Sequence, residues 1–70
     1  MEASVTLQLN GQPREIPCGS NVAALLASLG LTGQPVLVER NGTALFPRDF
    51  AATALLPGDV LEIIRIVAGG

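Results

Sequence analysis

The chain lacks most of the side chains on which enzyme active sites depend. It has no His, Lys, Trp or Tyr, a single cysteine, and only two aromatic rings, Phe46 and Phe50. A catalytic triad needs an imidazole base, and a zinc site needs three or four nitrogen or sulfur ligands, so this chain can supply neither. We therefore expect a protein that is not itself an enzyme and that holds no metal and no bound cofactor.

Charge is also scarce, and its balance is slightly acidic. Four basic and six acidic residues among seventy give a net charge of -2. Surfaces that bind nucleic acids need clustered Lys and Arg together with aromatic rings, and the longest apolar runs are far shorter than the ~20 residues of a membrane helix. We expect neither a nucleic-acid nor a membrane partner, and the acidic balance favours a partner with a positive surface.

Cysteine usage and the first residues bear on the cellular compartment. One cysteine cannot form an internal disulfide, and the N-terminus does not show the charged and then apolar segments of an export signal. We therefore expect a cytoplasmic protein. Cys18 has no cationic neighbour in sequence that would stabilise a thiolate, so we expect it to be a small hydrophobic side chain and not a redox group.

Alternating apolar residues and turn signals predict five strands. Asn10-Gly11 and Asn41-Gly42 can each supply the positive φ angles of a type I′ turn, so each pair should join two strands into a hairpin. Pro13 lacks an N–H group, and the strand that contains it should lie at a sheet edge or be bulged. Pro57-Gly58 predicts a turn before the last strand. The predicted strands are 5–9, 12–16, 36–40, 43–45 and 60–67.

One short helix is predicted between the two hairpins. Four apolar residues recur at helical spacing and so share one face. These residues are Val22, Leu25, Leu26 and Leu29. Either Ser20 or Asn21 is expected to cap the N-terminus of this helix, and Gly30 is expected to end it.

The predicted order of elements is ββαβββ. A helix packed across one mixed sheet gives a two-layer α+β domain, and parallel pairing of the first and last strands would use the long crossover that parallel strands require. This is the ubiquitin-like β-grasp arrangement, with a mixed sheet of four or five strands and one packed helix. We expect residues 1–67 to form the β-grasp domain and residues 68–70 to form a flexible C-terminal tail.

Side chains alternate between the two faces of a strand, and this alternation predicts an exposed apolar patch. In the last strand, Leu61 and Ile63 are assigned to the face under the helix, and strand 36–40 presents Val36 and Val38 to the same face. The residues assigned to the open face are Leu37, Glu39, Glu62, Ile64 and Ile66. An apolar patch rimmed by charge is a candidate docking surface for a partner. The alternative is that one of these isoleucines is merely half covered by its neighbours.

The sequence ends in Ala68-Gly69-Gly70, after Val67, the last residue that can anchor in a sheet. Glycine lacks a Cβ atom, so such a segment can thread a narrow channel and bring a terminal carboxylate to the reacting atoms of another enzyme. We identify Gly70 as the candidate reactive residue, with Ala68 and Gly69 as the segment that threads a partner's active site. The alternative is an incidental frayed end.

Two charged residues have simpler structural explanations. Asp59 is expected to stabilise the turn at Pro57-Gly58 by accepting hydrogen bonds from nearby backbone N–H groups. Arg48 is expected to cap its own turn or to pair with Asp49, the alternative being an ion pair with an acidic residue of a partner.

Several motifs resemble those of the ThiS family, the sulfur carrier proteins of thiamine thiazole biosynthesis. The Gly58-Asp59 turn, the hydrophobic strand after it and the final Ala68-Gly69-Gly70 resemble the close of that family. Upstream, the segment from Asn41-Gly42 to Pro47-Arg48-Asp49-Phe50 is similar to the family's Asn-Gly, short strand, Pro-Arg-x-x-aromatic pattern. Residues 20–31 resemble its small helix ending in Leu-Gly-Leu. The resemblance extends over essentially all seventy residues.

This resemblance implies a reaction at the C-terminal carboxylate. In the family, a ThiF-like adenylyltransferase, an enzyme of the ubiquitin-activating type, uses ATP to adenylate the terminal glycine, which here corresponds to Gly70. Sulfur from a cysteine desulfurase route then displaces AMP and leaves a thiocarboxylate. The thiocarboxylate donates its sulfur to a thiazole synthase.

Three other functions stay open. The small subunit of molybdopterin synthase shares the fold, the Gly-Gly end and the chemistry. A ubiquitin-type protein modifier is a second alternative, although a chain without Lys has no side-chain acceptor for conjugation to itself. The third is a plain β-grasp interaction module whose Gly-Gly end is incidental.

Overall fold

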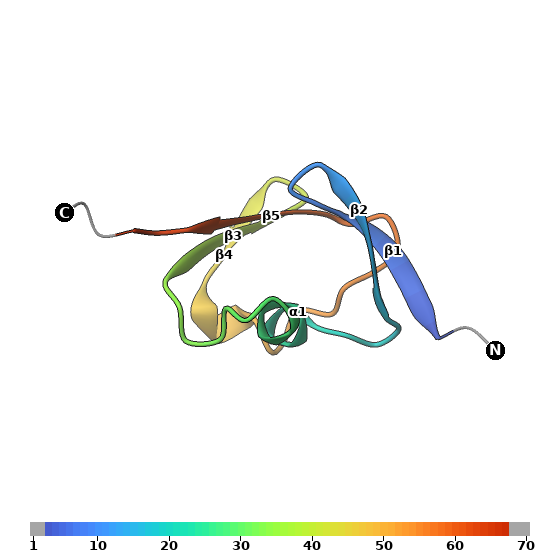
Figure 1. Cartoon of the computed structure of the whole chain (residues 1–70), viewed down its shortest axis with the longest axis horizontal. Helices are drawn as coiled ribbons and strands as arrows, with labels where there is room; N and C mark the ends of the chain where they lie inside the picture. Colours follow the sequence, from blue (N-terminus) through green and yellow to red (C-terminus); the bar gives the residue numbers. More distant parts are fainter. Residues whose placement is uncertain (1–2, 68–70) are drawn as a thin grey trace.

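Five strands form one mixed sheet, and a short helix packs against one of its faces (Figure 1). This computed structural model describes residues 3–67. The elements are β1 (Ser4–Leu9), β2 (Gln12–Pro17), α1 (Val22–Ser28), β3 (Val36–Arg40), β4 (Thr43–Leu45), the 3-10 helix η1 (Pro47–Asp49) and β5 (Val60–Arg65). With seven residues, α1 is too short to cross a bilayer, and residues 3–67 contain no longer helix that could.

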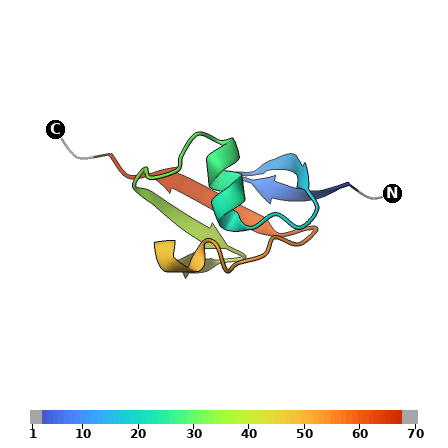
Figure 2. The same cartoon turned by 90° about the horizontal axis from the view of Figure 1, so that it is seen from below.

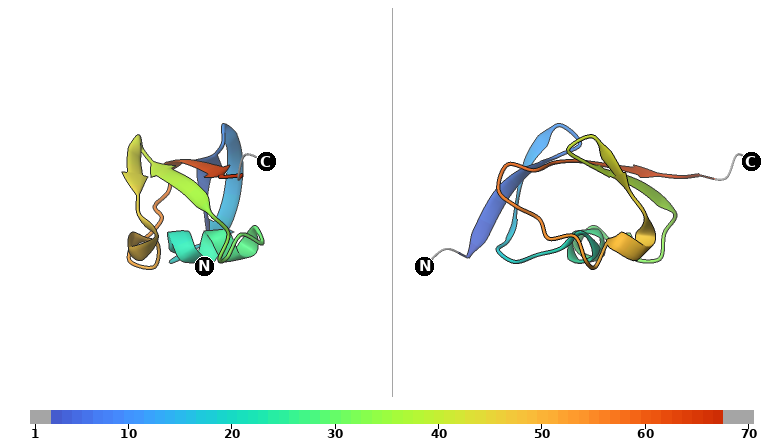
Figure 3. Two further views of the ribbon diagram at one scale, coloured as in Figure 1. Left: turned by 90° about the vertical axis from the view of Figure 1, so that its left-hand side faces the viewer. Right: turned by 180° about the vertical axis from the view of Figure 1, so that it is seen from behind.

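The last strand lies at the centre of the sheet. The strand order is β2-β1-β5-β3-β4, with β5 parallel to β1 and antiparallel to β3. Figure 3 shows the helix lying beneath the sheet, so that the opposite face of the sheet has no covering layer among the described residues. This arrangement confirms the predicted α+β fold of the β-grasp type.

The hairpins have the predicted turns, and β2 is an edge strand. Asn10 and Asn41 have φ angles of 50° and 52°, and the glycine after each also has a positive φ. Pro13 pairs with Gln8 in an unbroken register, so the sheet edge, and not a bulge, accommodates this proline.

The last strand is shorter than predicted. We expected it to extend to residue 67, but β5 ends at Arg65. The N–H of Ile66 still donates a hydrogen bond of 2.9 Å to the carbonyl of Pro35. Because proline has no N–H to donate back to Ile66, regular pairing with the segment that contains β3 stops here.

The helix has the predicted ends. Asn21, and not Ser20, is the N-cap, since its side chain accepts a 2.8 Å hydrogen bond from the N–H of Ala24. Ser20 instead donates from Oγ to the carbonyl of Pro17 at 2.6 Å. Gly30, with a φ of 74°, directly follows Leu29, the C-cap residue, and ends the helical conformation.

Aliphatic side chains alone form the buried core of the described residues. They come from the helix, from the four strands β1, β2, β3 and β5, and from the crossover before β5. The core residues are Leu7, Ile16, Val22, Leu25, Leu26, Val38, Leu55, Leu61 and Ile63. Leu29, which was expected on the buried helical face, is half-buried and packs against this cluster. The aliphatic core thus lies between α1 and the inner face of the sheet.

The parallel contact between β1 and β5 is short, and Asn10 extends it. The two strands pair only through Gln8 with Val60 and Leu9 with Leu61. Beyond these pairs, the Asn10 side chain continues the hydrogen bonding in place of a strand. Its Oδ1 accepts from the N–H of Ile63 at 2.8 Å, and its Nδ2 donates to the carbonyl of the same residue at 3.2 Å.

Asn41, in the second hairpin turn, binds β5 from the opposite side. Its N–H donates to the carbonyl of Val60 at 2.7 Å, and its Oδ1 accepts from the N–H of Val60 at 2.8 Å. The two turn asparagines therefore hold the same strand from both edges. We call Asn10 and Asn41 with these contacts the asparagine clasp.

Replacing Asn10 tests the contribution of the clasp to stability. Asn10→Gly accepts the positive φ but removes both side-chain hydrogen bonds, so we expect the free energy of unfolding to fall by about 1 to 3 kcal/mol in urea titrations. Asn10→Asp keeps an acceptor for the N–H of Ile63 and should lose less. A glycine variant that unfolds at the same urea concentration as the wild type would contradict the contribution of the clasp.

Candidate functional site

The chain leaves the domain at the end of β5. Figures 1 and 2 show this strand running past the ends of β1 and β2 toward the C-terminus. Val67, the last described residue, is 79% exposed. The predicted reactive residue Gly70 and the threading residues Ala68 and Gly69 lie outside the described residues. The structure therefore places the base of the predicted tail at an open end of the central strand.

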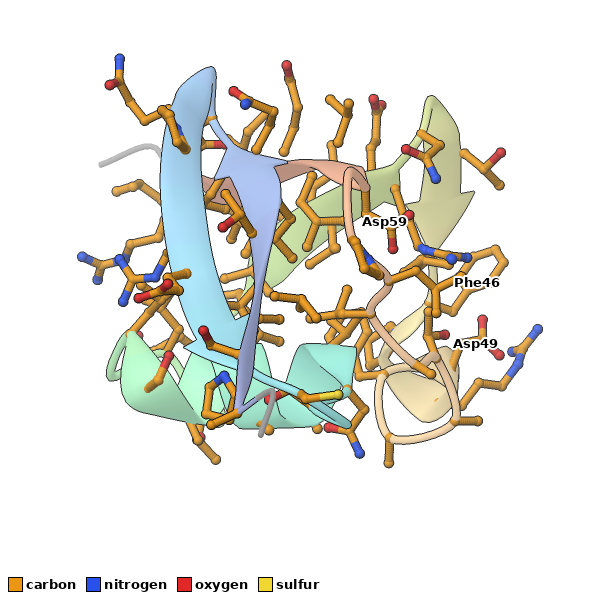
Figure 4. All side chains as sticks on the ribbon, turned by 90° about the vertical axis from the view of Figure 1, so that its right-hand side faces the viewer. Phe46, Asp49 and Asp59 are labelled. Atoms are coloured by element: carbon orange, nitrogen blue, oxygen red, sulfur yellow. The ribbon has the colours of Figure 1, made fainter. Side chains whose placement is uncertain are left out.

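The beginning of β5 is anchored by a buried carboxylate, Asp59. Its Oδ2 accepts hydrogen bonds of 2.9 Å from the N–H of Leu56 and from Nε of Arg40, which also forms an ion pair with it. Its Oδ1 accepts from Nδ2 of Asn41 at 3.2 Å. Figure 4 shows Asp59 at the turn where the crossover enters the sheet.

The turn role that we predicted for Asp59 is confirmed, but its two side-chain partners were not anticipated. The bond from Leu56 and the 3.1 Å backbone bond between Asp59 N–H and the Leu56 carbonyl close the turn. Arg40 and Asn41 lie almost twenty residues earlier in the sequence, and no local pattern connects them with this turn. The pairing of β3 with β5 brings them together.

The environment of Asp59 changes its acidity. Burial by itself would raise the pKa of this carboxyl, because a buried charge loses hydration. The hydrogen bonds from Leu56, Arg40 and Asn41 and the positive charge of Arg40 outweigh burial and hold the pKa below its ordinary value of 3.8. The charged form of Asp59 is therefore favoured in the folded chain.

The open face of the sheet carries the predicted apolar patch. Ile64 is 53% exposed and lies directly opposite Leu37, which is also exposed, whereas Ile63 on the inner face is only 7% exposed. The side-chain alternation that we predicted for these strands is therefore confirmed. Val60, at the other end of the strand, is also exposed and extends the apolar surface along β5.

Two glutamates adjoin this patch. Glu39 and Glu62 are directly opposite each other on the paired strands β3 and β5. Like charges in this position repel each other, and neither carboxylate has an ion pair among the described residues. This repulsion between Glu39 and Glu62 is unfavourable for the folded state, and it leaves negative charge available to a cationic group of a partner. We call Leu37, Glu39, Glu62 and Ile64 the open-face patch.

The arginines are absent from this face of the sheet. Arg14, Arg40 and Arg65 pair with Leu7, Leu61 and Val36, which all belong to the inner, helix-facing side. The fourth arginine lies in η1. Glu15, opposite Thr6, adds a third carboxylate to the open face. The face is therefore apolar and acidic.

Ile66 lies at the meeting point of two surfaces. It was assigned to the open face with Ile64, and it is exposed just beyond the end of β5. It also lines an apolar groove of about 590 Å³ between α1, η1 and the loop before β3. Other residues that line this groove are Leu26, Leu31, Pro35, Pro47 and Phe50. The groove therefore begins where the chain leaves the domain.

The remaining candidate residues differ from expectation. Arg48 does not pair with Asp49 in the structure but lies over the ring of Phe46, 4.8 Å from its centre. The Asp49 carboxylate accepts a hydrogen bond from the N–H of Phe46 at 3.2 Å instead (Figure 4). Cys18 is exposed in the loop after β2, so it does not contribute to the hydrophobic core, and its lack of a redox role stays a prediction. Within residues 3–67, no three potential metal ligands lie together.

The fold and the exit of β5 define a ubiquitin-like β-grasp domain. Residues 7–70 match the model of the ThiS family. The chain therefore belongs to the ThiS family, as its motifs had indicated.

The chain is also similar to a solved structure and to proteins of known sequence. The crystal structure of the thiamine biosynthesis protein ThiS from Geobacter metallireducens superposes with a TM-score of 0.80 and 33% identity, over 94% of this chain and 100% of that one. A thiazole synthase from Paramagnetospirillum magneticum is 38% identical over 64 residues, which cover 91% of this chain but 20% of that protein. The uncharacterized protein ycf40 of Pyropia yezoensis is 33% identical over 70 residues, 99% of its length. This chain thus spans about a fifth of the thiazole synthase that it matches.

The low pKa of Asp59 predicts a stability difference that depends on pH. A carboxyl whose pKa is lower in the folded state stabilises the fold above its unfolded pKa of about 3.8, and this stabilisation is lost as the pH falls through the folded value. At neutral pH, Asp59→Asn should lower the free energy of unfolding by about 1 to 3 kcal/mol. The difference between the two proteins should shrink below about pH 4 in urea titrations. A difference that stays constant into acid would refute this assignment.

Acidic substitutions at two adjacent isoleucines test the faces of β5. Ile64→Asp places the charge on the open face, so we expect a change in the free energy of unfolding of less than about 1 kcal/mol. Ile63→Asp places the same charge in the core and should leave the chain unfolded, as judged by circular dichroism. Unfolding of the Ile64 variant would show that the assignment of faces is wrong.

Proposed function

We propose that this chain is a sulfur carrier of thiamine biosynthesis, a protein substrate and not a catalyst, whose reactive group is the carboxylate of Gly70. The observation that carries the proposal is membership of the ThiS family over residues 7–70. It is supported by a central strand that leads directly out of the domain toward Ala68-Gly69-Gly70. The scarcity of catalytic side chains is consistent with chemistry at a backbone carboxylate.

The proposed chemistry begins with activation of a poor acyl donor. A ThiF-like adenylyltransferase joins the Gly70 carboxylate to the α-phosphate of ATP and releases pyrophosphate. The resulting mixed anhydride has AMP as a good leaving group. Sulfur from a cysteine desulfurase, reduced by a thiol to the oxidation level of sulfide, attacks the carbonyl carbon and displaces AMP, and a thiocarboxylate remains at Gly70. Because both steps depend on positioning, the partner supplies the catalytic groups and the carrier supplies a reachable carboxylate.

A thiazole synthase is the proposed recipient of the sulfur. In the Paramagnetospirillum magneticum protein, a segment similar to this chain is part of a polypeptide named thiazole synthase. That arrangement supports a close functional relation between the two proteins. We also place the reaction in the cytoplasm, which is consistent with a single cysteine that cannot form an internal disulfide.

The open-face patch is the proposed docking surface. Leu37 and Ile64 offer exposed apolar area beside the exit of the chain, and Ile66 extends it. Burial of this area would be favourable for association. A Lys or Arg of the partner would relieve the repulsion between Glu39 and Glu62, which the free carrier leaves uncompensated. Docking through this surface would hold the tail at the partner's active site.

Reconstitution with purified partners tests the carrier function. The chain is incubated with ATP, a sulfide source and the adenylyltransferase, and its intact mass is measured. We expect a mass increase equal to the replacement of one oxygen by sulfur at Gly70. Deletion of Gly69 and Gly70 should abolish this change while the domain stays folded, and Ile64→Asp should slow it by weakening docking.

The outcomes separate the possible functions. An unmodified mass for the intact chain, with an adenylyltransferase active on another carrier, would refute the proposal. A truncated chain that keeps both partner binding and activity would identify a plain interaction module. Capture of a large molybdopterin synthase subunit instead of a thiazole synthase would assign the same chemistry to the other pathway.

A further inference from the structure

The C-terminal half of β5 has one paired edge and one open edge. Backbone N–H and C=O groups of successive strand residues point alternately to the two sides of the strand. Hydrogen bonds of Val60 to Asn41 and of Ile66 to Pro35 show that the even-numbered residues of this strand face β3. The odd-numbered residues therefore face β1.

On the β1 side, the hydrogen-bond partners of the β5 backbone end before β5 itself ends. The carbonyl of Leu61 accepts from the N–H of Asn10, and the N–H and C=O of Ile63 are bound by the Asn10 side chain. The chain then turns back at Gly11 into β2, which pairs only with β1. The next groups on this edge, the N–H and C=O of Arg65, have no partner among the described residues. Figure 1 shows β5 continuing past the β1–β2 hairpin at this point.

An unpaired strand edge is a template for another extended chain. We propose that the β1-side edge of β5 at Arg65 pairs with an extended segment of the enzyme that activates Gly70. This inference rests on the proposed function, because the occupant is a segment of that enzyme. Pairing begins where the Asn10 side chain ends the domain's own hydrogen bonding and proceeds along the exit of the chain.

The side chains around this edge define the chemistry of the occupant. The guanidinium of Arg65 is exposed and has no ion pair among residues 3–67. A residue of the added strand on the same face is therefore Asp or Glu, since opposite charges across neighbouring strands attract. On the other face, exposed Ile64 and Ile66 flank this position. The segment thus alternates an acidic residue on one face with apolar residues on the other.

This edge differs from the open-face patch. The patch binds a partner through side chains on the flat of the sheet, whereas the edge binds through backbone groups in the plane of the sheet. A mutation of one can therefore leave the other intact. The edge also sets the direction of approach, because a strand added here lies alongside the residues that lead to Gly70.

Amide hydrogen exchange followed by NMR tests the pairing directly. In the free chain, the N–H of Arg65 should exchange rapidly and that of Ile66, bound to Pro35, should exchange slowly. On addition of the adenylyltransferase, exchange at Arg65 should slow by at least about tenfold. An enzyme that adenylates Gly70 normally without any slowing at Arg65 would overturn the edge pairing and leave the carrier function standing.

A pair of substitutions at one position separates the backbone from the side chain. Arg65→Ala removes only the guanidinium. Arg65→Pro also removes the N–H group on the open edge. In both variants, the backbone hydrogen bonds of Ile64 to β3 and of Ile66 to Pro35 remain. We expect the KM of the carrier for adenylation to rise for the alanine variant and to rise at least about tenfold further for the proline variant. Circular dichroism verifies the fold of both variants.

The two variants also separate the edge pairing from the carrier function. Equal KM values for the folded alanine and proline variants would refute backbone pairing at Arg65. An unchanged KM for both would refute the whole edge site, although adenylation itself would still support the carrier. A wild-type chain that is never adenylated would overturn the proposed function and, with it, the occupant inferred for this edge.

Discussion

The position of β5 between two hairpins is the constraint on which the rest of the structure depends. This strand contributes two fully or nearly fully buried residues, Leu61 and Ile63, to the core, and it connects the halves of the sheet. Its own ladder with β1 is only two residue pairs long. The asparagine clasp makes up for this, because Asn10 and Asn41 bind the backbone of β5 from opposite edges. A domain of this size has a small core, so each such contact is a large share of its stability.

The clasp also explains why the Asn-Gly turns matter beyond the hairpins. Positive φ angles at Asn10 and Asn41 form the tight turns, and the same geometry aims both side chains at β5. Asn41 also donates a hydrogen bond to Asp59, and Asp59 accepts a second hydrogen bond from Arg40. The second turn and the start of β5 therefore share one hydrogen-bond network. The strand is therefore well held where it enters the sheet and released where it leaves.

Stability and function make opposing demands on the outer face and the exit. The apolar residues of the open-face patch gain nothing from exposure, and the opposed glutamates repel each other. An unpaired edge at Arg65 is equally unhelpful to an isolated domain. These features lie together around the last residues of β5. A partner that covers the patch, pairs with the edge and receives the tail would satisfy all of them.

Most of the elements of the fold and the faces of the central strands could be predicted from local sequence. Asn-Gly pairs, helical spacing and strand alternation predicted the hairpins, α1 and the inward and outward faces of β3 and β5, because turn geometry and periodicity are local properties. The end of β5 at Arg65 was missed because it depends on Pro35, the residue before β3, which cannot return the hydrogen bond that it accepts from Ile66. The exposure of Cys18 and the stacking of Arg48 on Phe46 were also missed, since no sequence pattern indicates either of them.

By itself, the sequence determined the elements, their order and the family to which the motifs belong. Only the tertiary structure decided that Arg40 and Asn41 reach Asp59, that Glu39 faces Glu62, and that the backbone of Arg65 lies beyond the end of β1. Each of these depends on the register between strands far apart in the chain. Register is set by the packing of a whole sheet face against the helix, and no single segment contains that information.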